Sequence, residues 1–252
     1  MSATWRICWT VLTIVVVQTF VCGLALFPIV LIWSQLLAVT SGVNCVVALS
    51  VAAVPSYVLF ALLLMFVSAI TTRALNWQTP AHQQMRIASF EWPLLQWARG
   101  LVTSHIVRLF AGALFRSSPV WTAYLRLAGA RLGRRVYVNS LAVTDYNLLD
   151  CGDDVVIGDD AHVSGHTVED GLVKTAPLRI GSNVTIGLGS VLGIGVEVGD
   201  GCQVGALSFV PKYTRLAAGA VYAGIPVQRI GTAARARTEP SSAVWTGRNA
   251  MR

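Results

Sequence analysis

The sequence predicts a membrane-anchored protein in which an N-terminal transmembrane helical hairpin is followed by a β-solenoid, a parallel β-helix of hexapeptide repeats. Two observations support this fold class. Over residues 180–227 an aliphatic or aromatic residue recurs every six positions without a slip, a period that fits neither a helix nor a single strand but does fit a parallel β-helix. Between Arg6 and Arg73 the chain has two long apolar runs and no charged residue.

The two apolar runs, residues 7–33 and 43–70, each exceed the roughly 20 residues that a helix needs to cross a bilayer. The turn-like segment 34–42 divides them. A cleaved signal peptide is the alternative for the first run, but its apolar core exceeds the usual length of about 7–15 residues and no small-x-small cleavage site follows. Residues 1–73 are therefore expected to form a transmembrane hairpin.

Positive charge is concentrated before the β-helix. The net charge is +7, and residues 6–144 contain ten Arg and a single acid, Glu91, while the loop between the apolar runs is uncharged. The positive-inside rule therefore places both ends of the hairpin, and everything after it, in the cytoplasm. Because the Arg residues alternate with Trp, Leu and Ile, the expected partner is membrane lipid and not nucleic acid.

Residues 74–131 are expected to connect the hairpin to the β-helix. A helical pattern that begins at Trp92 keeps Arg99, Arg108 and Arg116 away from the centre of a broad apolar side, as in a helix lying in the membrane interface. The alternative is an amphipathic helix packed against the β-helix. A Ser-Ser-Pro break at 117–119 precedes a second short helix over 120–130. The apolar side consists of Leu94, Leu95, Ala98, Leu101, Val102, Ile106, Leu109, Phe110 and Leu114.

Each six-residue repeat opens with what we call a rung residue. Three repeats should make one triangular coil of about 18 residues, in which a rung residue stacks on its equivalent about 4.8 Å away in the next coil. The residue after it is small or turn-forming, mostly Gly, which is expected to relax the backbone at a corner with positive φ. The rung residues are Ile180, Ile186, Leu192, Val198, Val204, Val210, Leu216 and Tyr222.

The β-helix is expected to span residues 132–230. Leu132 and Val138 look like its first rung residues, and Cys151, Ile157 and Val163 form a second set. Between the two sets the frame shifts by one residue around 145–149, which predicts a bulge. Residues 231–252 lack periodicity and are expected to form a flexible basic tail.

The repeat fails over residues 164–177, where a loop is expected to replace parts of two or three repeats. Loops that interrupt a rigid solenoid often carry its function. This one contains His166, Glu169, Asp170 and Lys174, the densest group of ionisable residues in the chain. We therefore expect the functional site at this loop.

Several segments of this region carry a family resemblance. They are Ser164-Gly165-His166, Leu178-Arg179-Ile180-Gly181, Gly195-Val196-Glu197-Val198-Gly199-Asp200 and Ala223-Gly224-Ile225-Pro226. In them, and over about residues 130–230, the chain resembles the hexapeptide-repeat acyltransferases, which include the galactoside and maltose acetyltransferases. The resemblance implies a left-handed β-helix and a homotrimer. It also implies acetyl-CoA or another acyl-CoA as co-substrate, bound in the groove between neighbouring β-helices.

The same resemblance implies roles for single residues. His166 would be the general base, since an imidazole, with an ordinary pKa of about 6.5, can take a proton from an acceptor hydroxyl or amine at neutral pH. Glu169 would orient the imidazole, and a backbone N–H from the glycine-rich corners would hold the oxyanion. The acyl-CoA contacts implied are Gly187, Gly205, Ser208, Lys212 and Arg229, of which Lys212 and Arg229 would meet the phosphates.

The chain departs from the sugar acetyltransferases in ways that leave the acceptor open. The basic position of the closing motif is Gln228, with Arg229 one place late. The run His166-Thr167-Val168-Glu169-Asp170-Gly171 is more similar to the membrane-linked β-helix of peptide synthetases of the poly-lysine synthetase type. The acceptor can therefore be a sugar, a lipid-linked molecule, an amine or a peptide at the bacterial inner membrane. A non-catalytic trimeric scaffold, or an accessory module of a peptide synthetase, is the alternative function.

No metal is expected. The five cysteines, at 8, 22, 45, 151 and 202, include no Cys-x-x-Cys pair and indicate neither a disulfide framework nor a zinc site. Some β-helix trimers are zinc carbonic anhydrases, but these need three histidines, and the coil region has only His162 and His166. Corner residues such as Asp153 and Asp154 are better explained by hydrogen bonds to turns than by calcium.

Overall fold

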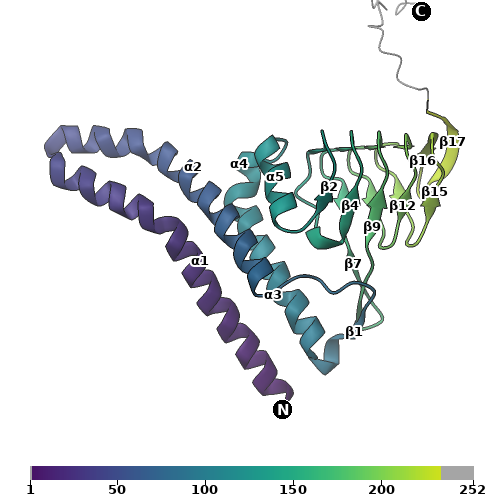
Figure 1. Cartoon of the computed structure of the whole chain (residues 1–252), viewed down its shortest axis with the longest axis horizontal. Coiled ribbons are helices and arrows are strands. Elements are labelled where there is room, and N and C mark those ends of the chain that lie inside the picture. Colours follow the sequence, from purple (N-terminus) through teal and green to yellow (C-terminus); the bar gives the residue numbers. More distant parts are fainter. Residues whose placement is uncertain (1, 234–252) are drawn as a thin grey trace, which may run out of the picture.

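The computed structural model describes residues 2–233, in which a long helical hairpin and a short helical connector precede a triangular prism of β-strands (Figure 1). The prism and the two apolar helices predicted from the sequence are both present. The helical elements are α1 (Ala3–Val39), α2 (Gly42–Ala74), the 3-10 turn η1 (Ile87–Ser89), α3 (Trp92–Val107), the π-helical turn η2 (Arg108–Gly112), α4 (Ala113–Phe115), α5 (Pro119–Leu127) and the 3-10 turn η3 (Tyr146–Leu148).

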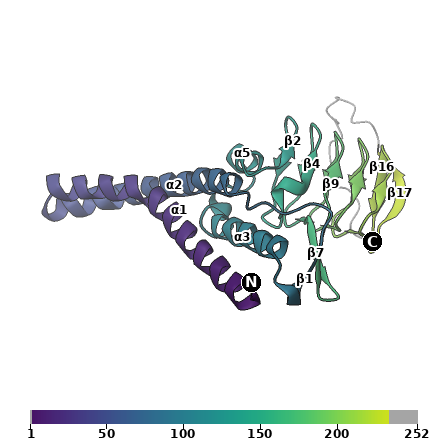
Figure 2. The ribbon, with the colours of Figure 1, turned by 60° about the horizontal axis from the view of Figure 1, so that its bottom comes forward.

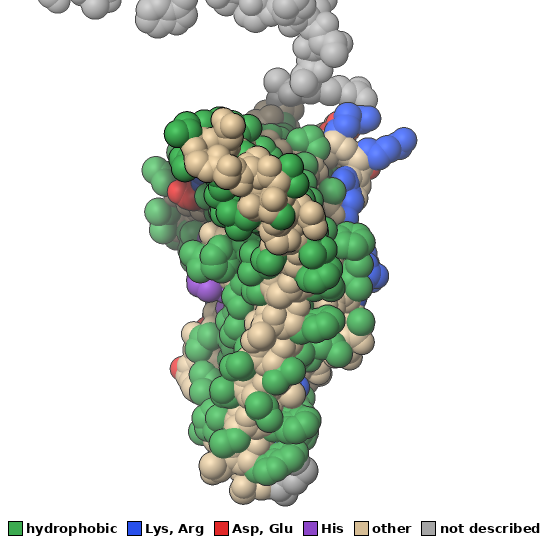
Figure 3. Space-filling view, turned by 90° about the vertical axis from the view of Figure 1, so that its left-hand side faces the viewer, with side chains coloured by type: hydrophobic (Ala, Val, Ile, Leu, Met, Phe, Trp, Pro, Cys, Tyr) green, Lys and Arg blue, Asp and Glu red, His purple; other side chains and the backbone are tan. Residues whose placement is uncertain are grey.

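Helices α1 and α2 are long and apolar enough to cross a membrane. Most of their side chains are not covered by the rest of the protein, and exposed examples include Phe20, Phe27, Val47 and Val51. Figure 3 looks onto this end of the molecule, where hydrophobic side chains cover most of the visible face. The core helix of a soluble protein would bury such residues, whereas here they remain exposed on the surface of the chain.

The connector joins the hairpin to the prism through two helices. α3 packs on α1 and α2 and buries Leu94 and Leu95, while Phe110 and Leu114 beyond its end stay exposed. The single helix expected over this stretch is therefore interrupted, because η2 and α4 follow Val107 instead of a regular continuation. α5 covers the first end of the prism, where Trp121 and Leu125 are fully buried in the same apolar cluster as the first coils.

Three sheets form the sides of the prism, and they are parallel except where β17 pairs with β16. Their strand orders are β17-β16-β13-β10-β5-β3, β14-β11-β6 and β15-β12-β9-β4-β2, and a separate antiparallel sheet has the order β1-β8-β7. The strands are β1 (Gln84–Arg86), β2 (Arg131–Leu132), β3 (Tyr137–Val138), β4 (Leu149–Cys151), β5 (Val156–Ile157), β6 (His162–Val163), β7 (His166–Glu169), β8 (Leu172–Thr175), β9 (Leu178–Ile180), β10 (Thr185–Ile186), β11 (Val191–Leu192), β12 (Glu197–Val198), β13 (Gln203–Val204), β14 (Phe209–Val210), β15 (Arg215–Leu216), β16 (Ala220–Ala223) and β17 (Gln228–Thr232).

The strand register confirms the predicted coil. Ile186 pairs with Val204, 18 residues further on, and the rung residues from Ile180 to Leu216 are all buried. The last rung residue of this set, Tyr222, is half-buried, since it lies in the final coil. The stacked aliphatic rungs therefore form a continuous core down the axis of the prism, as the six-residue period predicts.

Two irregularities interrupt the 18-residue register. Val138 pairs with Ile157, 19 residues on, so the expected one-residue bulge is present. Ile157 pairs with Ile186, 29 residues on, because one coil contains eleven extra residues. These residues form the antiparallel hairpin β7–β8, inserted at a corner between β6 and β9. The expected replacement of parts of two or three repeats is thus wrong, because the loop is an insertion: no side of the prism is lost, and the register resumes unchanged.

The corners correct a second expectation. The glycine after a rung residue does not have positive φ; the left-handed residue comes two places later, as at Asn183, Leu207 and Tyr213. The glycine serves close approach between coils instead. A Cβ on Gly193 would lie 2.7 Å from the backbone nitrogen of Lys212 in the next coil, so a side chain there would push the coils apart.

Strand β17 turns back on β16 in antiparallel fashion and ends the prism. The flexible basic tail expected from residue 231 falls almost wholly on 234–252, outside the described residues. Gly231 and Thr232 themselves belong to β17.

Candidate active site

The hairpin β7–β8 carries His166 at the start of its first strand. β6 ends at Val163, and Ser164 and Gly165 turn the chain out of the prism. A Cβ on Gly165 would lie 2.9 Å from the Cβ atoms of Asp145 and Leu148, so only glycine lets the chain pass this close to the bulge. His166 therefore leaves the prism directly beside Asp145.

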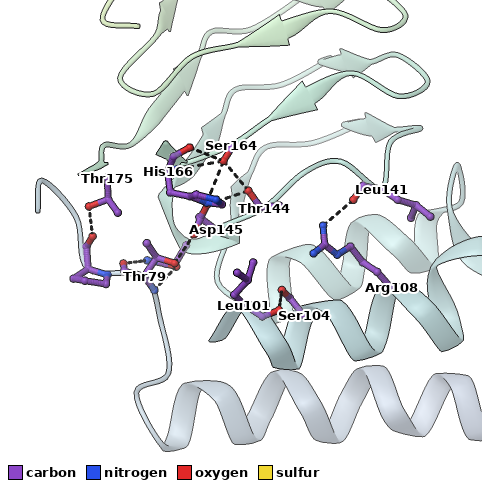
Figure 4. A network of polar contacts seen from close by, with 12 residues as sticks. Thr79, Leu101, Ser104, Arg108, Leu141, Thr144, Asp145, Ser164, His166 and Thr175 are labelled. Atoms are coloured by element: carbon purple, nitrogen blue, oxygen red, sulfur yellow. Dashed lines mark hydrogen bonds and ion pairs between the residues drawn. The ribbon is translucent and has the colours of Figure 1, made fainter. Parts of the chain in front are cut away.

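His166 and Asp145 form a close pair (Figure 4). The imidazole Nδ1 lies 2.6 Å from Asp145 Oδ2, and the side chains of His166 and Asp145 are 19% and 2% exposed. A carboxylate can only accept, so Nδ1 carries a hydrogen, and in the neutral imidazole Nε2 then has the free lone pair. The pair holds the imidazole in the tautomer whose Nε2 can accept a proton.

Asp145 stays ionised because its surroundings supply several donors. Burial raises the pKa of this carboxyl, but the hydrogen bonds from His166, Thr79 and Thr144 outweigh burial and hold the pKa below its usual value. Thr79 Oγ1 donates to Oδ1 at 2.6 Å, and Thr144 Oγ1 donates to Oδ2 at 3.0 Å. A buried negative charge thus faces the imidazole at neutral pH.

Two further groups contact the imidazole. Ser164 Oγ lies 3.2 Å from its Nδ1 and is itself hydrogen-bonded with Thr144. Trp97 of α3 packs edge-on against the ring, with the two ring centroids 5.0 Å apart and the planes at 67°. The connector therefore forms part of the wall around His166.

Glu169 does not contact His166, contrary to the role expected for it. Its carboxylate accepts from Lys174 Nζ at 2.8 Å and also contacts Lys212 Nζ. These two hydrogen bonds lower the pKa of Glu169 to about 2. Asp145 occupies the position expected for Glu169, and Glu169 instead ties the hairpin β7–β8 to the corner that carries Lys212.

The other residues expected to contact acyl-CoA lie along the coils after the hairpin. The N–H groups of Gly187 and Gly205 donate to carbonyl oxygens of the next coil, at 2.8 Å each. Ser208 is buried, and its Oγ accepts from the N–H of Gly224 at 3.3 Å. Arg229 lies on the exposed final strand β17. The structure brings Lys212 to the hairpin and places Arg229 on the terminal strand.

Within residues 2–233 no three His, Cys, Asp or Glu side chains are grouped closely enough to hold a metal ion. His162 lies on β6, four residues before His166. Burial first, and then the charges of His166 and Arg108, lower its pKa.

The repeat matches a known family model. Residues 177–209 match a family model described as the hexapeptide repeat of succinyl-transferase. This segment is a hexapeptide repeat. The resemblance to hexapeptide-repeat proteins expected from the sequence is thereby confirmed.

Among curated proteins, a delta-poly-L-ornithine synthetase of Acinetobacter baumannii (strain AB307-0294) is 24% identical to this chain over 111 residues. The match covers 44% of this chain and 8% of the synthetase, so this chain spans a small part of that relative's length. It agrees with the second resemblance, to peptide synthetases that make amino-acid polymers.

Solved structures of acyltransferases are also similar. An N-acyltransferase from Bacillus cereus in complex with dTDP and coenzyme A is 26% identical, with 34% of this chain and 52% of that chain covered and a TM-score of 0.31. A galactoside acetyltransferase in complex with coenzyme A is 23% identical, with 54% and 80% covered and a TM-score of 0.40. These neighbours are CoA-dependent acyltransferases, and each holds coenzyme A.

Proposed function

We propose that this chain is a membrane-bound acyltransferase. It moves an acetyl or other acyl group from acyl-CoA to a hydroxyl or amine of a cell-envelope sugar, a lipid-linked molecule or a peptide. One observation carries the proposal. His166, on the hairpin inserted in a hexapeptide-repeat prism, is bonded through Nδ1 to the buried carboxylate of Asp145. The matched family model is described as a repeat of succinyl-transferase, and succinyl transfer is acyl transfer.

In the proposed reaction His166 Nε2 takes the proton of the acceptor hydroxyl or amine. The acceptor oxygen or nitrogen then forms a bond to the thioester carbonyl carbon, and the carbon–sulfur bond breaks as the tetrahedral intermediate collapses. The proton on Nε2 passes to the departing sulfur, so His166 ends as it began. Asp145 keeps Nδ1 protonated and stabilises the imidazolium through its negative charge.

Acyl-CoA is proposed to lie along the coils that follow the hairpin, in contact with Gly187, Gly205, Ser208, Lys212 and Arg229. The N–H groups of Gly187 and Gly205 already donate to carbonyl oxygens of the next coil. These glycines would therefore let acyl-CoA approach the backbone closely and would not donate hydrogen bonds to it. Lys212 supplies positive charge at this corner, and its present partner is Glu169. A CoA phosphate would compete with Glu169 for the Lys212 ammonium.

Membrane anchoring is supported by the exposed apolar surface of α1 and α2. The excess of Arg over acid in residues 6–144 favours a hairpin in the bacterial inner membrane with both chain ends and the β-helix on the cytoplasmic side. Acyl-CoA is a cytoplasmic metabolite, so this orientation places the proposed site where its co-substrate is.

A homotrimer of left-handed β-helices is proposed as the active form. The sheet β14-β11-β6 turns Val191 and Phe209 outward, with 38% and 37% of each exposed, and Leu188 and Leu207 at its corners are more exposed still. This apolar side is adjacent to the end of β6 from which His166 departs. Burying it between copies would remove apolar area from water and bring a second prism beside the site.

The test is acyl transfer by the full chain in lipid nanodiscs. Release of free CoA is measured with acetyl-CoA and with longer acyl-CoAs, against cell-envelope sugars, lipid-linked precursors and peptides. We expect turnover with at least one pair, and a loss of roughly 100-fold or more in kcat for His166→Ala, since a general base contributes about that much. The matched control is His105→Ala, an exposed histidine of α3.

Two results would contradict the proposal. The first is equal turnover by the wild-type chain and His166→Ala. The second is failure of the wild-type chain to bind acetyl-CoA in calorimetry while it remains folded, which would favour the non-catalytic scaffold.

A further inference from the structure

The segment between α2 and α3 runs alongside the hairpin that carries His166. α2 ends at Ala74, and the chain then forms β1, whose Met85 pairs with Val173 of β8 in an antiparallel register. Figures 1 and 2 both show β1 and β7 beside the N-terminal end of α3. The connector that leaves the apolar hairpin thus adds a third strand to the sheet of the candidate site.

Thr79, in this segment, fixes the far oxygen of the Asp145 carboxylate. Its Oγ1 donates to Oδ1 at 2.6 Å, while Oδ2 takes the bonds from His166 and Thr144. Asn147 holds the Thr79 backbone on both sides, accepting from its N–H at 3.1 Å and donating to its C=O at 2.8 Å. With both oxygens bonded, the carboxylate cannot turn away from the imidazole.

The turn that follows, before β1, is fastened as firmly. Thr175, which pairs with His166 across the hairpin, donates its Oγ1 to the carbonyl of Pro80 at 2.6 Å. The same Oγ1 accepts from the N–H of Gln83 at 3.0 Å. Residues 79–83 are therefore bonded to both partners of His166, the carboxylate beside its ring and the strand opposite its backbone.

Trp97 completes the enclosure from α3. Its indole packs against the imidazole, and the apolar cluster of Met85, Leu94 and Val173 supports it. Neither Thr79 nor Trp97 belongs to the repeat region, and both lie in the part of the chain that follows the apolar hairpin.

We propose that Thr79 and Trp97 are positioning residues that hold the Asp145–His166 pair in its working geometry, so that the connector from the apolar hairpin completes the active site. This inference rests on the proposed acyl transfer by His166. Thr79 acts through Asp145 by fixing the carboxylate, and Trp97 restricts rotation of the imidazole. Thr79 lies five residues after the end of α2, so the orientation of the base depends on where the hairpin is held.

The experiment compares variants of the full chain in nanodiscs. We expect Thr79→Val, which keeps the shape but loses the hydroxyl, to lower kcat at least tenfold with KM for acetyl-CoA within about twofold. Thr79→Ser restores the hydroxyl and is expected to recover most of the kcat. Trp97→Ala is expected to lower kcat similarly, and Trp97→Phe, which keeps an aromatic ring, to lower it less. Thr185→Val, at an exposed position of β10, is the control.

A second readout does not depend on turnover. In protein labelled with ¹⁵N-histidine, the Nδ1–H resonance of His166, assigned by its absence in His166→Ala, is expected to shift or broaden in Thr79→Val and to return in Thr79→Ser. The positioning role would be overturned if Thr79→Ser had a kcat no higher than that of Thr79→Val. It would also be overturned if Trp97→Phe lost as much kcat as Trp97→Ala.

The experiments distinguish failure of the positioning role from failure of the proposed acyl transfer. If His166→Ala is inactive while Thr79→Val and Trp97→Ala keep wild-type kcat and an unchanged resonance, the positioning role is wrong and acyl transfer stands. If His166→Ala is fully active, acyl transfer through His166 is wrong, and this inference is overturned with it.

Discussion

Asp145 is the residue on which the candidate site depends most. It is nearly fully buried, it is bonded to His166, Thr79 and Thr144, and it lies at the bulge where the prism loses its regular register. Its backbone is left-handed, with φ of 51°, a conformation that Asp adopts more readily than most residues. The irregular geometry of the bulge thus turns a carboxylate toward the loop.

We predict that Asp145→Asn abolishes most of the activity while the prism stays folded. The amide keeps the shape of the carboxyl group but removes its charge, and its NH₂ can donate to Nδ1 and so favour the wrong imidazole tautomer. The kcat for acyl transfer should fall by roughly 100-fold or more. Asp170→Asn, at the exposed tip of the same hairpin, is the control and should keep wild-type kcat.

Asp145 also predicts how stability depends on pH. Its pKa is lowered in the folded chain, so the unfolded chain binds more protons in the acid range. The stabilisation is fully present above the ordinary value of 3.8 and is lost as pH falls through the folded value. Thermal unfolding followed by circular dichroism should therefore show the difference in Tm between wild type and Asp145→Asn shrinking below about pH 4. A difference that grows toward acid would contradict this sign.

At the level of elements, the stacked rung residues carry the stability of the prism. Ile186 is fully buried between Ile157 and Val204 of the neighbouring coils. Ile186→Ala should lower the free energy of unfolding by about 2–5 kcal/mol, because a cavity is left in the core. Thr185→Ala removes the exposed neighbour on the same strand and should cost far less. Equal unfolding midpoints for the two variants would show that residue 186 does not line the core.

Much of this architecture could be predicted from the sequence, since a period of six fixes which side chains point inward and how far apart stacked residues lie. The one-residue bulge was also visible as a frame shift. The inserted hairpin was not, because a failed repeat gives the position of a loop but not whether the sheet continues through it. The place of positive φ was misassigned, since glycine serves both turns and close approach.

The site was predictable only in part. The loop and His166 stood out by their ionisable residues, but Asp145 is 21 residues from His166, and the contact exists only because the bulge and the loop share one corner. Glu169 was the nearer acid in sequence and is bonded to lysines instead. No sequence signal marked Thr79 or Trp97, because side chains from the connector meet the site only through tertiary packing.

At the scale of the whole molecule, the apolar side of the prism predicts self-association. Phe209→Glu places a charge on the exposed face of β14 and should break the proposed trimer into monomers, since a buried unpaired charge costs several kcal/mol. Light scattering on size-exclusion fractions in detergent would measure the mass. Thr185→Glu, on the outer face of another sheet, should leave the mass unchanged. A trimer that survives Phe209→Glu would place the interface elsewhere.

The eleven-residue excursion at β7–β8 leaves the coils before and after it in an unbroken ladder. The stacking of the coils therefore does not depend on the length of the hairpin, and this length can change without disturbing a stacked rung residue. A change in this one short stretch would therefore reshape the candidate site, while the core along the axis of the prism remains the same. The candidate site and the stacked core thus belong to different parts of the polypeptide.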